Sequence, residues 1–147
     1  MPRFCAFPRS ARLGLASLAV LISSSWLMAV PPPPTMAARF LKALATGIEG
    51  SPKVAIQDAS VLAEFKALGI AQENGAKVAW ASSSQELKTY LGQKKLVVAS
   101  SLELLTEGAA IAVVVEDARL TVYFNIENAK KIGQTIPDLV MKMGKPH

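Results

Sequence analysis

Short apolar runs alternate with stretches of helical spacing along most of the chain. Residues 53–57 (KVAIQ), 77–81 (KVAWA) and 95–99 (KLVVA) have the length and composition of buried strands. Helical spacing of apolar residues follows the first two strands, and residues 100–105 fit a single helical turn after the third. Asp58 and the serines at 82–84 stand where helix caps are expected. Each strand therefore begins a strand–helix unit.

The two ends of this region predict further elements. Thr35 is placed to cap a first helix that Gly47 and Gly50 end. Residues 109–115 and 119–125 are β-rich and are separated by three residues, which is hairpin spacing. Asn125 then caps a helix that runs through Lys131, and a last helix follows Pro137.

The alternation of strands and helices sets the expected fold class. Parallel strands need a crossover segment between them, and helices supply it while covering the faces of the sheet. We expect an α/β fold with a small, mostly parallel sheet, helices on both faces and an antiparallel hairpin at an edge. One domain, over residues 36–147, accounts for these elements.

The first 29 residues have the layout of a cleaved signal peptide. Arg3, Arg9 and Arg12 precede an apolar run over residues 13–28, which ends before Val30 and four prolines. The run covers 16 positions and contains three serines, whereas a membrane-spanning helix needs about 20 apolar residues. We therefore favour a cleaved leader over a permanent anchor and expect a periplasmic protein. Residues 30–35 form a stiff proline-rich spacer.

Charge and composition narrow the function classes. Cleavage after residue 29 leaves 13 basic and 11 acidic side chains, so little positive charge remains for nucleic acid. The single cysteine, Cys5, lies in the leader, and the single histidine, His147, is the last residue, where chain ends usually fray. Histidine-based catalysis needs a histidine held in the fold, and most zinc sites need several histidine or cysteine ligands. We expect a non-enzymatic protein without a cofactor or a metal.

Serines at two strand ends are the candidate ligand or partner contacts. Ser82, Ser83 and Ser84 follow one strand, and Ser100 and Ser101 follow the next. Backbone N–H groups at a helix N-terminus bind anions, and the carboxyl ends of parallel strands are the usual ligand position in open sheets. Ordinary helix capping explains the same residues. Trp80 and Tyr90 fit core positions better than a ligand site.

The C-terminal half resembles the YfiR-like family of periplasmic regulators. The resemblance extends from residue 108 to 143, and AWASSSQEL upstream is similar to a strand-then-serine segment of the family. Pro137 departs from the family's usual serine, and the family's disulfide cysteines have no counterpart after the leader. The matching positions are Gly108, Arg119, Phe124, Asn125, Ala129, Gly133 and Leu139.

The resemblance implies a regulator that acts by protein contact. Such a protein would restrain a membrane-bound diguanylate cyclase through the periplasmic domain of the cyclase and so lower cyclic di-GMP. A sensor kinase is the other partner that the resemblance suggests, and homodimerisation stays open. The exposed side of the helix over residues 126–131, with Lys130, and the strand-end serines are the expected contact surfaces. A periplasmic small-molecule binding protein is the alternative function.

Overall fold

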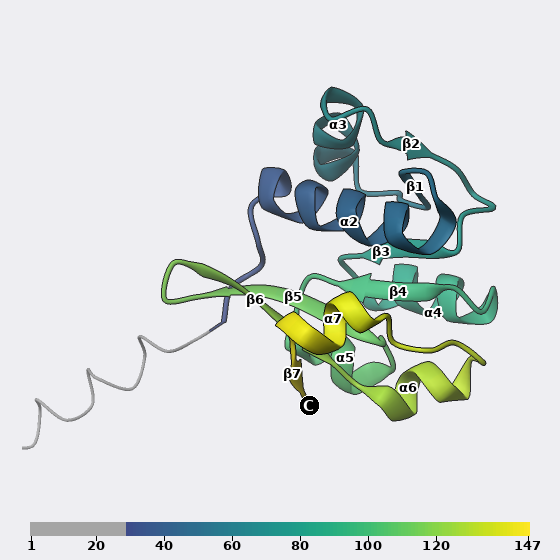
Figure 1. Ribbon diagram of the computed structural model, residues 1–147, viewed down its shortest axis with the longest axis vertical. Coiled ribbons are helices and arrows are strands. Elements are labelled where there is room, and N and C mark those ends of the chain that lie inside the picture. The colour runs from purple at the N-terminus through teal and green to yellow at the C-terminus, as the bar shows by residue number, and fades with distance from the viewer. Residues whose placement is uncertain (1–28) are drawn as a thin grey trace, which may run out of the picture.

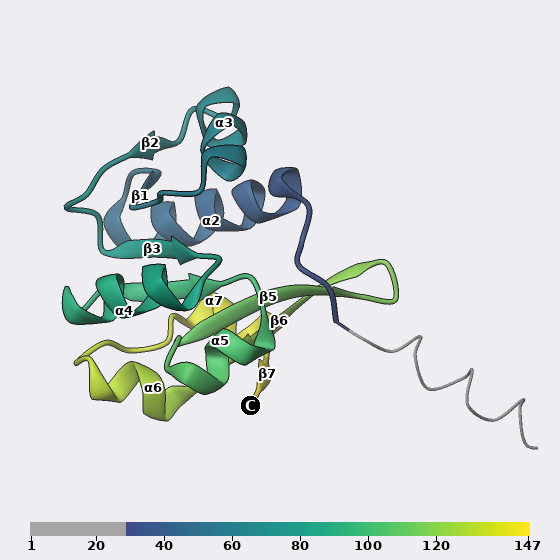
Figure 2. The same ribbon diagram turned by 180° about the vertical axis from the view of Figure 1, so that it is seen from behind.

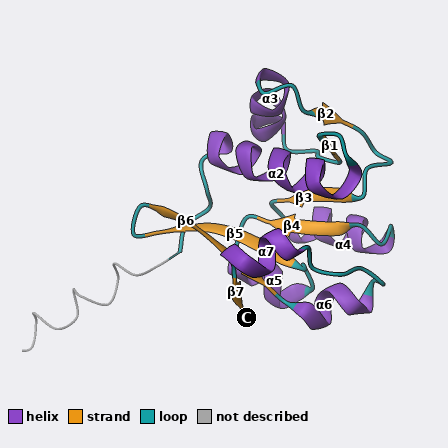
Figure 3. Ribbon diagram, in the orientation of Figure 1, coloured by secondary structure: helices purple, strands orange, loops and turns teal. Residues whose placement is uncertain are grey.

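The structure is a computed structural model that describes residues 29–147. The predicted signal peptide therefore lies outside the described residues, apart from Ala29. Helices and strands alternate along most of the described chain (Figure 3). The helices are α2 (Pro34–Glu49), α3 (Ala59–Ala67), α4 (Ser84–Gly92), α5 (Leu102–Glu107), α6 (Ile126–Lys131) and α7 (Asp138–Met143). The strands are β1 (Lys53–Val54), β2 (Ala71–Gln72), β3 (Val78–Ala81), β4 (Leu96–Ala99), β5 (Ile111–Glu116), β6 (Arg119–Phe124) and β7 (Lys145–Pro146).

The strands form two sheets that one backbone bridge connects. Strands β1 and β2 pair in parallel, and the larger sheet has the order β3-β4-β5-β6-β7. Strands β3, β4 and β5 are parallel, whereas β5 and β6 form the antiparallel hairpin. A parallel bridge between Ala55 and Ala79 places β1 beside β3. The predicted α/β fold is confirmed.

Helices cover both faces of the larger sheet, and the two faces differ in side-chain size. Trp80, Val98 and Ile111 belong to the core under α2, α3 and α7. Ala81, Ala99 and other small residues face α4 and α5, which lie in front of the sheet in Figure 2. Successive strand residues point to opposite faces, so the fully buried runs of β3 and β4 serve both cores.

The positions of α3 and α4 follow from the strand order. The connection from β1 through α3 leads to β2 on one side, and the connection from β3 through α4 leads to β4 on the other. Right-handed crossovers in opposite directions need helices on opposite faces. Helix α3 accordingly packs in the core with α2, and α4 packs in the other core with α5 (Figure 1).

The N-terminal spacer is shorter than we predicted. Helix α2 begins at Pro34, and Thr35 does not cap it, because the capping position is Pro33 and no side chain bonds the first turn. A proline suits the first helical position, where its missing N–H has no partner in any case. Val30 pairs its backbone with Val115 of β5, at 3.2 and 2.9 Å.

The C-terminal residues pair with the sheet. The backbone N–H of His147 donates to the carbonyl of Phe124 at 2.9 Å, beside the short parallel pairing of β6 with β7. Gly144 allows the chain to turn from α7 into β7, because a Cβ at this position would lie 2.7 Å from the carbonyl oxygen of Val140. The predicted hairpin thus has β7 beyond it, but β7 pairs only with Tyr123 and Phe124, so the rest of β6 is the edge of the sheet.

The β5–β6 turn has two residues where we predicted three. Glu116 pairs with Arg119, and the two residues between them, Asp117 and Ala118, have φ of 51° and 62°. A tight type I′ hairpin needs positive φ at both central positions and prefers Asn-Gly or Asp-Gly. Alanine is strained in this region because its Cβ approaches the following carbonyl oxygen.

We expect Ala118→Gly to stabilise the protein. Relief of left-handed strain, about 1–2 kcal/mol, exceeds the entropic cost of glycine, about 0.5–1 kcal/mol. Urea unfolding should therefore give a free energy of unfolding higher by up to about 1 kcal/mol. A lower value would show that the turn does not have this conformation.

Asn128 holds α6 against the rest of the fold. Its buried side-chain amide donates to the carbonyls of Leu105 and Ala109, at 2.8 and 2.9 Å, while its backbone N–H donates to the Asn125 cap at 3.0 Å. Asn128→Ala should lower the free energy of unfolding by about 2 kcal/mol, since it removes two buried hydrogen bonds; the Leu105 carbonyl keeps the N–H of Gly108 at 3.3 Å, whereas the Ala109 carbonyl loses this partner. Asn125→Ala removes one cap and should cost only about 1 kcal/mol. Equal losses on chemical unfolding would contradict this ranking.

Candidate functional site

The exposed large apolar side chains of the described chain gather around α7. Residues 29–147 contain six of them, and five line cavities on the two sides of this helix. A single exposed apolar side chain is ordinary, but a contiguous group on a small protein marks a binding surface. We call this group the α7 surface; its members are Met36, Ile126, Leu139, Met141 and Met143.

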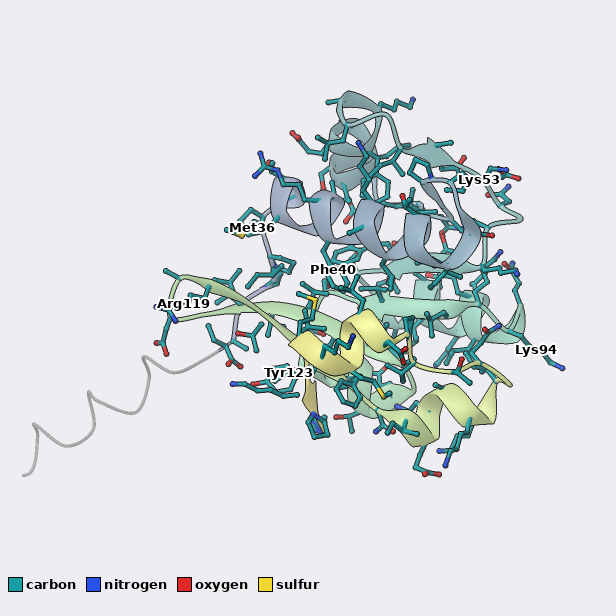
Figure 4. All side chains as sticks on the ribbon, viewed as in Figure 1. Met36, Phe40, Lys53, Lys94, Arg119 and Tyr123 are labelled. Carbon is teal, nitrogen blue, oxygen red and sulfur yellow. The ribbon has the colours of Figure 1, made fainter. Side chains whose placement is uncertain are left out.

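The α2–α7 groove forms one half of the α7 surface. It has a volume of about 350 Å³ and is walled by Met36, Phe40 and Ala43 of α2 and by Leu139 and Met143 of α7, with Leu120 of β6 and Arg39 completing it. The wall residues are spaced by three or four positions along each helix, so they form two ridges with a channel between them. Figure 4 shows Met36 and Phe40 on α2 above the position of α7.

The α6–α7 cavity forms the other half. It has a volume of about 280 Å³ and lies between Ile126 and Lys130 of α6, Met141 of α7 and the segment that joins the two helices. Lys130 reaches Glu127 at 3.6 Å, and both side chains are largely exposed. The predicted contact surface on α6 therefore adjoins this cavity.

Methionine is concentrated on the α7 surface. The described chain has three methionines, Met36, Met141 and Met143, and each is more than a third exposed. A methionine side chain is flexible and polarisable, so it adapts to differently shaped apolar partners. The α7 surface therefore has the composition of an adaptable docking surface.

The sequence of α7 explains why it exposes apolar side chains. Four of its six residues are apolar (DLVMKM), and they are distributed around the helix instead of along one face. Only Val140 is buried, against the core that α2 covers. Leu139, Met141 and Met143 therefore point away from the core.

The strand-end serines do lie side by side. Strands β3 and β4 are parallel neighbours, and the N–H of Ser100 donates to the carbonyl of Ala81 at 3.1 Å. Their hydroxyls serve as helix caps: that of Ser83 accepts from the N–H of Glu86 at 3.2 Å, and that of Ser101 accepts from the N–H of Leu104 at 3.4 Å.

A carboxylate of the chain itself occupies the start of α4. Glu86 Oε2 accepts from the N–H and the hydroxyl of Ser82, at 3.0 and 3.3 Å. Ser83 and Glu86 have the spacing of a capping box, but only the bond from the Glu86 N–H to the Ser83 hydroxyl is present, because the carboxylate bonds Ser82 instead of Ser83. Ser84 is the first residue of the helix. An internal acid thus takes two of the donors that we expected at this position, the N–H and the hydroxyl of Ser82.

Lys130 lies far from these serines in the sheet. The antiparallel pairing of Ile111 with Phe124 puts the end of β6, and hence α6, beside the start of β5. The serines follow the ends of β3 and β4, which run parallel to β5. The segment after α6 contacts the start of β4, because Gln134 Nε2 donates to the carbonyl of Lys94 at 3.1 Å, whereas Ser100 and Ser101 follow the end of β4. Lys130 and the serines therefore lie toward opposite ends of this strand and do not form one site.

Asp58 lies at the switch point of the strand order, where the connection from β1 leads to one side and the connection from β3 leads to the other. It follows β1, and Ser82 follows the neighbouring β3, so both stand at the crevice where open α/β sheets usually bind ligands. Burial raises the pKa of Asp58, but hydrogen bonds from Ser60, Val61 and Ser82 outweigh it and lower the pKa below its ordinary value. Asp58 also caps α3, as predicted: Ser60 N–H lies 3.0 Å from its Oδ1.

Trp80, Tyr90 and Glu116 have structural positions. Trp80 and Tyr90 are buried, as predicted. Glu116 accepts two contacts from the Tyr123 hydroxyl, at 2.8 and 3.0 Å, and these raise the pKa of Tyr123 together with burial and the charge of the carboxylate. Between residues 29 and 147, His, Cys, Asp and Glu side chains form no group of three that could hold a metal. No helix in the same range has the length and apolar content to cross a membrane.

Comparison with known proteins adds no family to these observations. No family model matches the chain, and no curated protein matches it.

The α7 surface was not predicted from the sequence. Leu139 and Met143 were assigned to a last helix, and the expected contacts on α6 were the nearest prediction. A usable signal was present: a six-residue helix with four apolar residues must expose some of them, because a helix in contact with one core buries only one stripe.

We expect Asp58→Asn to lower stability near neutral pH but not in strong acid, because asparagine caps a helix as well as aspartate does but does not ionise. A carboxyl whose pKa is lowered by folding contributes stability above its unfolded pKa, near 3.8, and that contribution is lost as the pH falls. Near pH 6 the variant should be less stable by about 0.5 kcal/mol, and the difference should vanish by about pH 2. Thermal unfolding at both pH values tests this, and a pH-independent difference would contradict it.

Proposed function

We propose that this protein is an exported regulator that acts by binding another protein through its α7 surface. The observation that carries the proposal is the gathering of five exposed apolar side chains around one helix. Burial of apolar area drives protein association, at roughly 25 cal/mol for each Å² removed from water. A stable isolated domain gains nothing from leaving these side chains in water, which favours a role for them in contact.

We further propose that the partner is the periplasmic domain of a membrane diguanylate cyclase, which the protein restrains. The resemblance of residues 108–143 to YfiR-like regulators supports this choice, and it includes α6 and α7, which flank the α6–α7 cavity. A restraining protein needs only to bind the inactive conformation more tightly, and a tenfold preference corresponds to about 1.4 kcal/mol. Surface contact is sufficient for such a preference.

A small-molecule binding protein is the second candidate. The adjoining carboxyl ends of β1, β3 and β4 favour it, since this is the ligand position of open sheets. Against it, Ser83 and Ser101 already accept bonds from helix N–H groups, and Glu86 occupies the N–H of Ser82. The α7 surface has no part in this alternative, so the two functions respond to different variants.

Deletion of the gene should raise cellular cyclic di-GMP, and the full chain with its leader should restore the normal level. Met143→Glu should restore it poorly, because a carboxylate placed in an apolar contact is desolvated without a partner. Met143 is 52% exposed, so the variant should fold. Lys88→Glu, on exposed α4 surface in the opposite layer, is the matched control and should restore the level fully.

Two results would count against the proposal. Unchanged cyclic di-GMP on deletion, with the cyclase expressed, would reject the cyclase as partner. Full rescue by Met143→Glu together with failure of Ser83→Arg would assign the function to the strand-end serines and favour the small-molecule binder.

A further inference from the structure

The charge of the two cavities beside α7 restricts what can occupy them. Their linings contain two ionisable side chains, Arg39 in the α2–α7 groove and Lys130 in the α6–α7 cavity, and both are cationic. Lys130 has Glu127 within 3.6 Å. Arg39 differs, because the ion pairs of the described chain join Lys53 to Glu73 and Lys130 to Glu127 and do not include it.

Arg39 is placed to receive a carboxylate from outside. It stands on the α2 wall between Met36 and Ala43, at the border of an otherwise apolar groove. A guanidinium at the edge of an apolar contact binds carboxylates in bidentate geometry and sets the register of the partner. Acidic side chains do not line this groove, so the complementary charge must come from the occupant.

The shape of the groove favours a helix as the occupant. Met36, Phe40 and Ala43 lie at positions i, i+4 and i+7 of α2, and Leu139 and Met143 lie at i and i+4 of α7. Two such rows are the ridges between which a third helix packs its own side chains. Helix-in-groove recognition uses apolar anchors at this spacing, and methionine-rich walls suit it.

Two other occupants fit the observations less well. A membrane surface takes apolar side chains that project from one face, whereas this groove has two helix walls and the buried side chain of Phe40 in its lining. A second copy in a twofold dimer would bring the same patch against itself, so neither Arg39 would meet an acid in the facing lining. Like charges at a contact oppose association.

We infer that the α2–α7 groove binds an amphipathic helix of a partner protein, with an Asp or Glu on its flank paired with Arg39. This inference rests on the proposed function and names the chemistry of its partner. The apolar face of the helix lies between Met36 and Met143, and the acidic residue stands one helical turn along from an apolar anchor. The acid specifies orientation, and the apolar anchors supply the affinity.

Photo-crosslinking in the native host tests the inference with the full exported chain. Met143 is replaced by p-benzoylphenylalanine, and the same substitution at Lys88, in the opposite layer, is the control. Peptides joined to position 143 are identified by mass spectrometry. We expect a peptide of another protein that has apolar residues at helical spacing and an Asp or Glu, and we expect no such peptide from position 88.

The other outcomes separate this inference from the proposed function. A crosslinked peptide of another protein without an acid or helical spacing would overturn the inference and leave contact regulation standing. A peptide of this chain would identify a second copy as the occupant and overturn the inference. Crosslinks to lipid, or none above the control, would overturn both.

A charge exchange then tests the role of Arg39. With the crosslinked partner domain purified, Arg39→Glu should weaken binding about tenfold or more, and Arg39→Lys should weaken it less. Changing the partner's acid to arginine should restore binding to the Arg39→Glu variant. Equal binding by wild type and Arg39→Glu would contradict the proposed pair, and circular dichroism of each variant confirms folding.

Discussion

The fold depends on covering both faces of the buried parallel strands β3 and β4 with few residues. Each of these strands is four residues long and buried throughout, so helices must lie on both sides. The face under α4 and α5 is lined largely by alanine, which allows these short helices to lie close to the sheet. The other face carries Trp80, Ile111 and other large side chains and requires the long helix α2.

The α7 surface is a consequence of the same constraint. Helix α2 packs closest to β1 and α3 and shares one core with β3 and β4, and the β6 end of the sheet is left to α7 (Figure 1). One buried residue, Val140, provides this cover, and the rest of α7 faces solvent. The helix thus joins the core by one side chain while it presents three apolar residues outward, which connects the packing of the domain directly to its proposed binding role.

Much of the fold could be predicted because local signals decide it. The strands around Trp80, Val98 and Val113 are apolar runs of the right length, and the caps at Asp58, Ser83 and Asn125 follow from side-chain chemistry at helix starts. Strands β2 and β7 were missed, since two residues carry no periodicity. The site could not be predicted in the same way. Both the separation of Lys130 from the serines and the exposure of α7 depend on strand order and on which face each helix covers.

Methionine oxidation can measure whether a partner covers the α7 surface. Met36, Met141 and Met143 are exposed in the free chain and react with peroxide to form sulfoxides. The three rates can be followed by mass spectrometry, with the purified cyclase domain present or absent. The account predicts that the domain slows oxidation of Met36 and Met143 in the groove most strongly. Unchanged rates at all three methionines while the two proteins are demonstrably bound would contradict it.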